Sequence, residues 1–431
     1  MSSQKQYSLQ FFVIILVSFS SSCFSSYQNY PFVYKRSFGS MSENLMSRIS
    51  SRARAPVSSR NVVNVDDFRA KGDGTDDSQA FMEAWEEACS SDNEAVLIVP
   101  RHKIYHLKPV TFSGPCKSDL TMKIYGTIKA TVRVSDYNKD PRHWLVFQNV
   151  NNLRVEGGGT INGNGKIWWR QSCKVNTALP CKGAPTAITF DECNNLRVGS
   201  LRFRNSQQMH LSFQNCVNVE ASNLRIYAPG NSPNTDGIHV TGTQNIQIKN
   251  CVIRTGDDCI SIVSGSRNVR ATDIICGPGH GISIGSLGAG NSEAFVSNVM
   301  VDRARLSGTT NGMRIKTWQG GSGYARNIIF QNIMMYNVSN PIIIDQHYCD
   351  QEEPCREQAS AVQVSNVMYR NIKGTSASEV AIKLDCSKRH PCKGLVLQDV
   401  LLGLFEGDEI AKASCLNVNL SSRGSISPHC A

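Results

Sequence analysis

A short phrase recurs along the chain and constrains its fold more than any other feature of the sequence. It consists of Asn, an apolar residue, any residue and usually a second apolar residue, as in Asn152-Leu-Arg-Val and Asn245-Ile-Gln-Ile. Its first residues are Asn152, Asn195, Asn218, Asn245, Asn268, Asn298 and Asn327. After a first step of 43 residues, the copies follow at intervals of 23 to 30 residues. Intervals of this size are typical of one coil of a solenoid.

A second set of short strands lies between the copies of this phrase. They are rich in Ile and Val and begin at a turn residue, as in Gly237-Ile-His-Val, Gly281-Ile-Ser-Ile and Gly312-Met-Arg-Ile. This pattern favours β over α structure, and the coils are too short for helical crossovers between parallel strands. We therefore predict an all-β protein, a right-handed parallel β-helix whose coils bury Ile and Val against one another. The recurring Asn is predicted to form a structural ladder at the turns, where it satisfies buried backbone groups.

One segment near the start of this solenoid has a helical rather than a β pattern. Residues 78–89 (SQAFMEAWEEAC) place apolar side chains at the spacing of a helix face. We predict a short helix that closes the N-terminal end of the β-helix, with Asp76 or Asp77 as its cap. Trp85 is then a core residue rather than a platform for a ligand.

The first 60 residues differ from the rest of the chain. Residues 1–23 are predicted to be a secretory signal, because Lys5 precedes an apolar run of nine residues at 11–19 and small residues follow it. That run is too short to span about 30 Å of hydrocarbon. Residues 24–60 are rich in Ser and Arg, typical of a processed or disordered leader. Residues 61–431 are predicted to form the β-helix domain.

The charge balance gives no support for a nucleic acid partner. The whole chain carries a formal charge of +10, but residues 1–60 hold seven Lys or Arg and one acid, which leaves +4 for the remainder. No basic run is interleaved with aromatic residues, as a nucleic acid interface would require.

The cysteines indicate an oxidising compartment. The chain has 16, and Cys23 falls in the predicted signal, so at least one of the remaining 15 is unpaired. Spacings suited to a metal site are missing, and an export signal favours disulfides. Four close pairs are the candidates: Cys173 with Cys181, Cys349 with Cys355, Cys386 with Cys392, and Cys415 with Cys430. Glycosylation sequons at Asn337 and Asn419 fit the same compartment.

Alignment of the second set of strands stacks polar residues in columns. Two residues before the aligned apolar positions stand Asp236, Asp258, His280 and Asn311. Neighbouring strands lie about 4.7–4.9 Å apart, so these side chains become lateral neighbours. Counting back along the strand favours Asp257 over Asp258 as the outward carboxylate, although Gly256 interrupts the count.

Two cations complete the cluster. The two-residue period of a strand turns Arg314 and Lys316 outward. Three carboxylates, one imidazole and two cations therefore converge on one outer face.

Each of these residues alone has an ordinary structural explanation, since Asp commonly forms turns and a lone His is usually structural. Three acids one coil apart, however, repel one another, so at least one should have a raised pKa. Such groups concentrate at functional sites. Paired carboxylates suit glycoside hydrolysis, in which an acid protonates the leaving oxygen and a base activates water. The two cations suit a substrate that carries carboxylates, and a polymer of uronic acid meets both needs.

Four segments of the chain resemble a known signature. Asn234-Thr-Asp-Gly, Gly256-Asp-Asp-Cys, Gly279-His-Gly and Arg314-Ile-Lys are similar, in this order, to the polygalacturonase signature of glycoside hydrolase family 28. The resemblance runs from about residue 61 to the C-terminus. The segments 64–68 (NVDDF) and 71–77 (KGDGTDD) resemble the plant branch, especially enzymes of cell separation in abscission and dehiscence. Arg69 departs from the Gly that is usual in that phrase.

The resemblance assigns catalytic roles position by position. Asp257 is expected to be the general acid, and His280 to tune it electrostatically. Asp236 and Asp258 are expected to hold and activate the attacking water. The family hydrolyses its substrate with inversion and uses no metal or other cofactor.

The resemblance also implies the substrate and its contacts. Arg314 and Lys316 are expected to bind the galacturonate carboxylate, with Asn234 and Tyr348 as sugar contacts. The expected partner is polygalacturonate or pectin, attacked at internal (endo) bonds, with exo attack as the alternative. We expect a monomer that is secreted to the cell wall, loosens it during cell separation and, after signal cleavage, binds no membrane.

Two other functions suit the same fold. A pectin or pectate lyase has this architecture, but pectate lyases use calcium and a basic residue as base. A non-catalytic wall-binding β-helix has no need for three crowded acids. We therefore predict a hydrolase.

Overall fold

The computed structural model describes residues 60–351, 355–406 and 410–430. The predicted signal at 1–23 and nearly all of the predicted leader at 24–60 lie outside these residues. The domain predicted over 61–431 falls within one compact unit, residues 58–431. Within the described part of the chain, no helix is long and apolar enough to cross a membrane.

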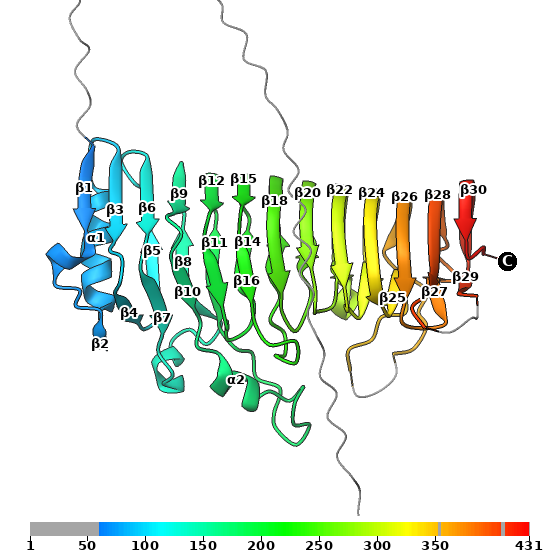
Figure 1. Cartoon of the computed structure of the whole chain (residues 1–431), viewed down its shortest axis with the longest axis horizontal. Helices are drawn as coiled ribbons and strands as arrows, with labels where there is room; N and C mark the ends of the chain where they lie inside the picture. Colours follow the sequence, from blue (N-terminus) through cyan, green and yellow to red (C-terminus); the bar gives the residue numbers. More distant parts are fainter. Residues whose placement is uncertain (1–59, 352–354, 407–409, 431) are drawn as a thin grey trace, which may run out of the picture. The chain divides into compact units, whose positions relative to one another are not determined.

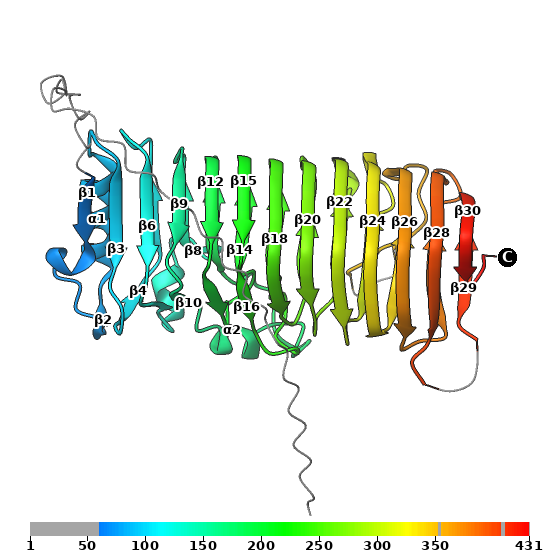
Figure 2. The same ribbon diagram turned by 45° about the horizontal axis from the view of Figure 1, so that its top comes forward.

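Two long parallel sheets form the walls of the solenoid (Figures 1 and 2). The smaller sheet has eleven strands, and their spatial order follows the chain. They are β5 (Val110–Ser113), β8 (His143–Gln148), β11 (Thr186–Asp191), β14 (Leu211–Gln214), β17 (Ile238–Thr241), β19 (Ile260–Ile262), β21 (Ile282–Leu287), β23 (Asn311–Thr317), β25 (Asn340–Asp345), β27 (Val380–Asp385) and β29 (Lys412–Leu416). The predicted right-handed parallel β-helix is confirmed.

The larger sheet has nineteen strands and contributes the other side of every coil. They are β1 (Asn61–Asn64), β2 (Asp73–Asp76), β3 (Ala95–Val99), β4 (Ile104–Leu107), β6 (Leu120–Ile124), β7 (Thr127–Ala130), β9 (Leu153–Glu156), β10 (Thr160–Asn162), β12 (Asn194–Gly199), β13 (Arg202–Arg204), β15 (Val217–Ser222), β16 (Arg225–Tyr227), β18 (Gln244–Arg254), β20 (Arg267–Cys276), β22 (Glu293–Ser307), β24 (Ser322–Val338), β26 (Gln363–Ser376), β28 (Cys392–Leu404) and β30 (Val418–Ser427). Helices are few and short: α1 (Ser78–Cys89), α2 (Lys166–Arg170) and the 3-10 turns Val65–Phe68, Val134–Tyr137 and Ala289–Asn291.

The register between coils is set by columns of buried apolar side chains. Ile238, Ile260, Ile282 and Met313 pair in succession, as predicted, and each is fully buried. A column of four Phe residues fills the N-terminal half, with neighbouring ring centroids 4.9–5.6 Å apart. Because a slip of one residue would turn every such side chain to the opposite face, this packing holds the coils in one register.

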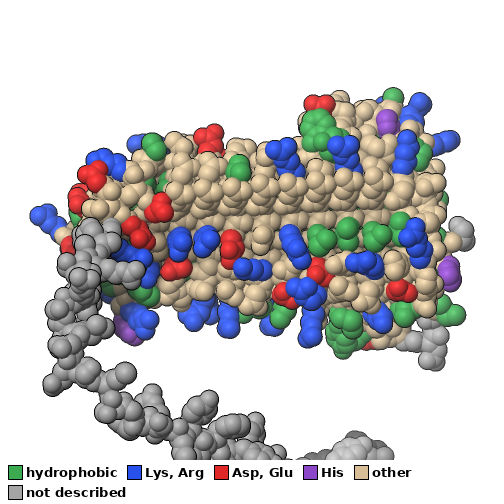
Figure 3. Space-filling view, turned by 90° about the horizontal axis from the view of Figure 1, so that it is seen from above, with side chains coloured by type: hydrophobic (Ala, Val, Ile, Leu, Met, Phe, Trp, Pro, Cys, Tyr) green, Lys and Arg blue, Asp and Glu red, His purple; other side chains and the backbone are tan. Residues whose placement is uncertain are grey.

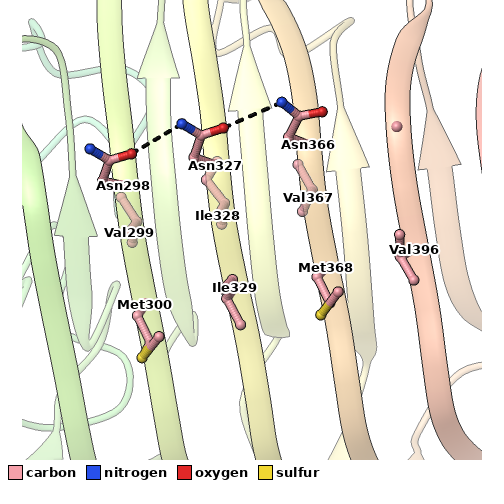
Figure 4. Close-up of a pocket in the computed structure, with 11 residues that line it drawn as sticks. Asn298, Val299, Met300, Asn327, Ile328, Ile329, Asn366, Val367, Met368 and Val396 are labelled. Carbon is pink, nitrogen blue, oxygen red and sulfur yellow. Dashed lines mark hydrogen bonds between the residues drawn. The ribbon is translucent and has the colours of Figure 1, made fainter.

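The predicted Asn ladder is present, but its side chains bond to one another at the surface and not, as expected, to buried backbone groups. Asn298 and Asn327 lie inside β22 and β24, where they adopt left-handed φ values of 57° and 58°, a conformation that Asn tolerates better than most residues. Their side-chain amides link neighbouring coils, with Nδ2 to Oδ1 distances of 3.1 Å from Asn327 to Asn298 and 3.3 Å from Asn366 to Asn327 (Figure 4). The ladder therefore satisfies its own polar groups from coil to coil.

Beside this ladder runs an apolar strip on the outer surface. Val299 and Ile328 point into the core, whereas Met300, Ile329 and Met368 stay partly exposed in one register column (Figure 4). A band of hydrophobic side chains is visible on this face in Figure 3.

Helix α1 closes the N-terminal end, as predicted. Trp85 is 3% exposed and packs on the Phe column, so its assignment to the core is confirmed. Asp77 occupies the N-cap position, but its carboxylate accepts from the backbone of Lys71 and Gly72 instead of from the helix. Asp76 takes the capping role by accepting from the Ser78 N–H at 3.1 Å. The chain before α1 turns at Arg69, whose φ of 73° explains why Gly suits this position.

All four predicted disulfides are present. Two more, Cys89–Cys116 and Cys259–Cys276, join cysteines 27 and 17 residues apart, which proximity in sequence did not indicate. Among the described residues, Cys193, Cys216 and Cys251 are buried and carry no disulfide, so the predicted unpaired thiol is confirmed.

Candidate active site

The predicted cluster forms one pocket of about 590 Å³ on the outer face of the eleven-stranded sheet. Asp236 precedes β17, the pair Asp257 and Asp258 precedes β19, and His280 precedes β21. The segments that lead into these strands are irregular, which lets consecutive residues such as Asp257 and Asp258 face the same pocket. Both Asp257 and Asp258 therefore line the site, which corrects the expectation that Asp257 and not Asp258 faces outward.

Asp258 is the most tightly held of the three acids. Its Oδ1 accepts from Ser283 at 2.7 Å and from Arg314 at 2.9 Å, and its Oδ2 accepts from Lys316 at 3.1 Å. The two cations point outward from β23, as predicted, but fold over Asp258, so their side chains are only 12% and 10% exposed. Asp258 and its two cationic partners thus form one buried ion cluster.

Asp236 has a different environment. It is 7% exposed, and its carboxylate accepts from Ser261 at 2.7 Å. Burial raises its pKa well above the usual range, and the charges of Asp257 and Asp258 raise it further. The prediction of a raised pKa in the cluster is confirmed for this residue.

Asp257 bonds to groups at the mouth of the pocket. Its carboxylate lies 2.8 Å from Nδ1 of His280 and accepts from Asn234 at 3.1 Å and from the Asp258 N–H at 2.8 Å. Burial acts to raise its pKa, but the hydrogen bond and charge of His280 outweigh burial, with help from Lys316, and the pKa is lowered. Asp236 and Asp257 thus have shifts of opposite sign within one pocket.

The structure also brings the two predicted sugar contacts to this site. Asn234 lines the pocket and donates to Asp257. Tyr348 lines it from the segment after β25, with its ring 5.3 Å from Nζ of Lys316. Burial raises the pKa of Tyr348 to about 12, so its hydroxyl stays protonated and able to donate.

Strand alignment places three further polar residues in one column with Arg314, but sequence reasoning gave them no role in supporting the acids. Ser261 and Ser283 bind Asp236 and Asp258, and His239 lies 2.8 Å from Ser261. Burial lowers the pKa of His239 to about 4, so this imidazole is neutral. The signal was their register with Arg314, which places all of them in one column.

Two other missed residues, Lys174 and Asp350, line the same pocket. They belong to loops far apart in the sequence, and no strand alignment could place them together.

One part of the cluster has the composition of a metal site. Ligand atoms of Asp257, Asp258 and His280 lie within 4.8 Å of one another. Both oxygens of Asp258, however, already bind Arg314 and Lys316, and these cations would repel a divalent ion. The site therefore suits the two side-chain cations, Arg314 and Lys316, rather than a calcium or magnesium ion. A second group has Asp345 on β25, His347 in the turn that follows β25, and Asp385 on β27.

The chain is similar in sequence to a known family and to named plant proteins. A family model, "Glycosyl hydrolases family 28", matches residues 89–429. The chain is 58% identical to "Polygalacturonase QRT2" of Arabidopsis thaliana over 97% of this chain and 98% of the relative, and 58% identical to "Polygalacturonase-2" of Solanum lycopersicum over 86% and 80%.

Solved structures show the same fold at lower identity. A polygalacturonase from Erwinia carotovora superposes with a TM-score of 0.70 at 22% identity, covering 87% of this chain and 99% of that one. An exopolygalacturonase from Thermotoga maritima gives 0.69 at 22% identity, covering 84% and 90%. The family match and the high identity to full-length relatives place this chain in glycosyl hydrolases family 28.

Proposed function

We propose that the protein is a secreted polygalacturonase that hydrolyses the α-1,4-galacturonosyl linkages of de-esterified pectin. The observation that carries the proposal is the pocket in which Asp236, Asp257 and Asp258 lie beside Arg314 and Lys316. Carboxyl groups supply the acid and base of glycoside hydrolysis, and the cations suit a uronate ring. The two plant relatives that are 58% identical to this chain both carry the name polygalacturonase.

The proposed mechanism is an inverting displacement. Asp257 protonates the leaving sugar oxygen, while Asp236 and Asp258 hold and activate the water on the opposite face. Arg314 and Lys316 bind the galacturonate carboxylate, with Asn234 and Tyr348 as further sugar contacts.

The pKa directions bear on the choice of acid. In the ligand-free protein the raised pKa belongs to Asp236, which favours Asp236 as the protonated member of the pair. The family resemblance assigns the proton to Asp257, whose pKa is held down by His280. The His280 side chain is 41% exposed and can exchange Asp257 for a bound sugar. Loss of that bond would raise the pKa of Asp257 when the substrate arrives.

The proposed setting is the plant cell wall during cell separation. Six disulfides in the described residues support export, since disulfides persist in oxidising compartments. Identity to plant polygalacturonases supports the cell-wall substrate.

Product analysis tests both the activity and the mechanism. The purified protein should release reducing ends from polygalacturonate without producing an unsaturated product, and a chelator should leave the rate unchanged. Proton NMR during early turnover should show the anomer opposite to the substrate linkage, because water and not Asp attacks the sugar. An unsaturated product would indicate a lyase, and initial retention of configuration would contradict the assigned roles.

A further inference from the structure

Two loops that are far apart in the sequence meet at an ion pair. Nζ of Lys174 lies 2.5 Å from Oδ1 of Asp350, across 176 residues of chain. Lys174 belongs to the segment between β10 and β11, and Asp350 to the segment that follows β25. Both segments project below the sheets in Figure 1.

The topology places this ion pair over the outer face of the eleven-stranded sheet, where the catalytic pocket lies. The first loop enters β11, so it leaves the edge where the strands of the eleven-stranded sheet begin. The second loop follows β25, so it leaves the edge where these parallel strands end. A contact between loops from opposite edges has to pass over the face between them. That face carries Asp236, Asp257 and His280, which line the same pocket as Lys174 and Asp350.

The contact also runs obliquely along the solenoid. β11 and β25 are six strand positions apart in the sheet, or roughly 28 Å at the usual strand spacing. The strands that carry the acids and cations, β17 to β23, lie within this interval. Lys174 and Asp350 therefore form a strap across the catalytic groove.

Disulfides position both halves of the strap. Lys174 directly follows Cys173, which is bonded to Cys181, and Asp350 directly follows Cys349, which is bonded to Cys355. Each charged residue is thus anchored at the base of a covalently closed loop.

A polyanion interacts in opposite ways with the two charged residues of the strap. A carboxylate-bearing polymer in the groove attracts Lys174 and repels Asp350. The two side chains are 47% and 49% exposed, and an ion pair this exposed is weak enough to exchange partners. Arg314 and Lys316, in contrast, are buried against Asp258.

We propose that Lys174 is a further substrate-binding residue and that a carboxylate of the bound polyuronate replaces Asp350 as its partner. The strap thus spans the groove in the free protein and transfers its cation to the polymer on binding. This inference rests on the proposed polygalacturonate substrate.

A double-mutant cycle tests the exchange. We compare Lys174→Ala, Asp350→Ala and the double variant on polygalacturonate at low ionic strength, with kcat and KM measured separately. Lys174→Ala should raise KM about 3- to 10-fold and leave kcat within about 2-fold, since Lys174 contacts none of the three acids. Asp350→Ala should lower KM about 2- to 5-fold because Lys174 loses its competitor. In the Lys174→Ala background, Asp350→Ala should have little further effect on KM.

Lys117→Ala is the matched control. It removes an exposed Lys from an ion pair with Asp92, and neither residue lines the catalytic pocket. Its KM should equal that of the parent. The exposed positions of the strap predict parental melting temperatures for all of these variants.

Two results would overturn the strap. A raised KM for Asp350→Ala would show that the ion pair only stabilises the structure of the groove. An equal fall in KM in both backgrounds would show that Asp350 acts through its charge alone. Calorimetric titration with an oligogalacturonate, run in parallel, separates this from the proposed function. Binding without hydrolysis would reject the proposed activity, and the double-mutant cycle would then be measured with Kd in place of KM. If the parent protein does not bind the oligogalacturonate, both the proposed function and the role of Lys174 are rejected.

Discussion

Substitution of two neighbouring acids by Asn should change stability in opposite directions. Asp236→Asn keeps the shape of the side chain and an oxygen that accepts from Ser261. It removes a carboxylate whose pKa is raised by burial and by the charges of Asp257 and Asp258. A folded-state pKa above the unfolded value means that ionisation favours the unfolded chain. The substitution should therefore stabilise the fold at neutral pH.

The size of the gain follows from linkage. Each tenfold change in the acid dissociation constant between the unfolded and the folded state corresponds to about 1.4 kcal/mol. In a domain of this size, that free energy raises the melting temperature by roughly 2 °C. The gain over the parent should be largest at neutral pH and vanish below the ordinary pKa of Asp, where the carboxyl is protonated in both states.

Asp258→Asn is the contrasting variant. Its carboxylate binds both Arg314 and Lys316 and is 3% exposed. Its loss leaves two buried cations without an anion, which typically costs about 3–5 kcal/mol. The melting temperature should therefore fall, although the chemical change is the same as at Asp236.

Differential scanning calorimetry from pH 3 to pH 8, with the disulfides intact, measures both effects. Both variants should lose most activity if these acids position the water. A lower melting temperature for Asp236→Asn at neutral pH, or a gain that does not depend on pH, would refute the electrostatic account of this site.

Asp257→Asn should lower kcat by at least about 100-fold on polygalacturonate and by far less on a galacturonide with an acidic phenol as leaving group. An equal loss on both substrates would contradict its role as the acid. Arg314→Ala should weaken productive binding of polygalacturonate by roughly one to two decades in KM, and should weaken binding of fully methyl-esterified pectin less. Equal losses would mean that Arg314 does not recognise the carboxylate. Asn327→Ala should reduce the free energy of unfolding by about 1–3 kcal/mol, because it removes ladder hydrogen bonds and strains a φ of 58°. Chemical denaturation compares it with Asn327→Gly, which removes the bonds without the strain and should be the milder change.

The sequence alone was sufficient to predict the architecture and most of the site. A solenoid repeats one structural unit, so its period, its inward Ile column and its Asn ladder are all local patterns that can be read along the chain. The same regularity converts positions such as Asp236 and Asp258 into lateral neighbours, because each coil returns the chain to the same face. The family resemblance named the roles, but the column of side chains was already visible in the spacing.

Tertiary structure decided what this periodicity does not encode. The irregular segment before β19 lets Asp257 and Asp258 face one pocket, where strict alternation would have separated them. Burial and neighbouring charges, rather than residue type, give Asp236 and Asp257 pKa shifts of opposite sign. The contact between Lys174 and Asp350 depends on the paths of two loops that follow no repeat. Strand register can be predicted from local pattern, whereas loop contacts and the polarity around a carboxylate arise only when the whole chain is packed.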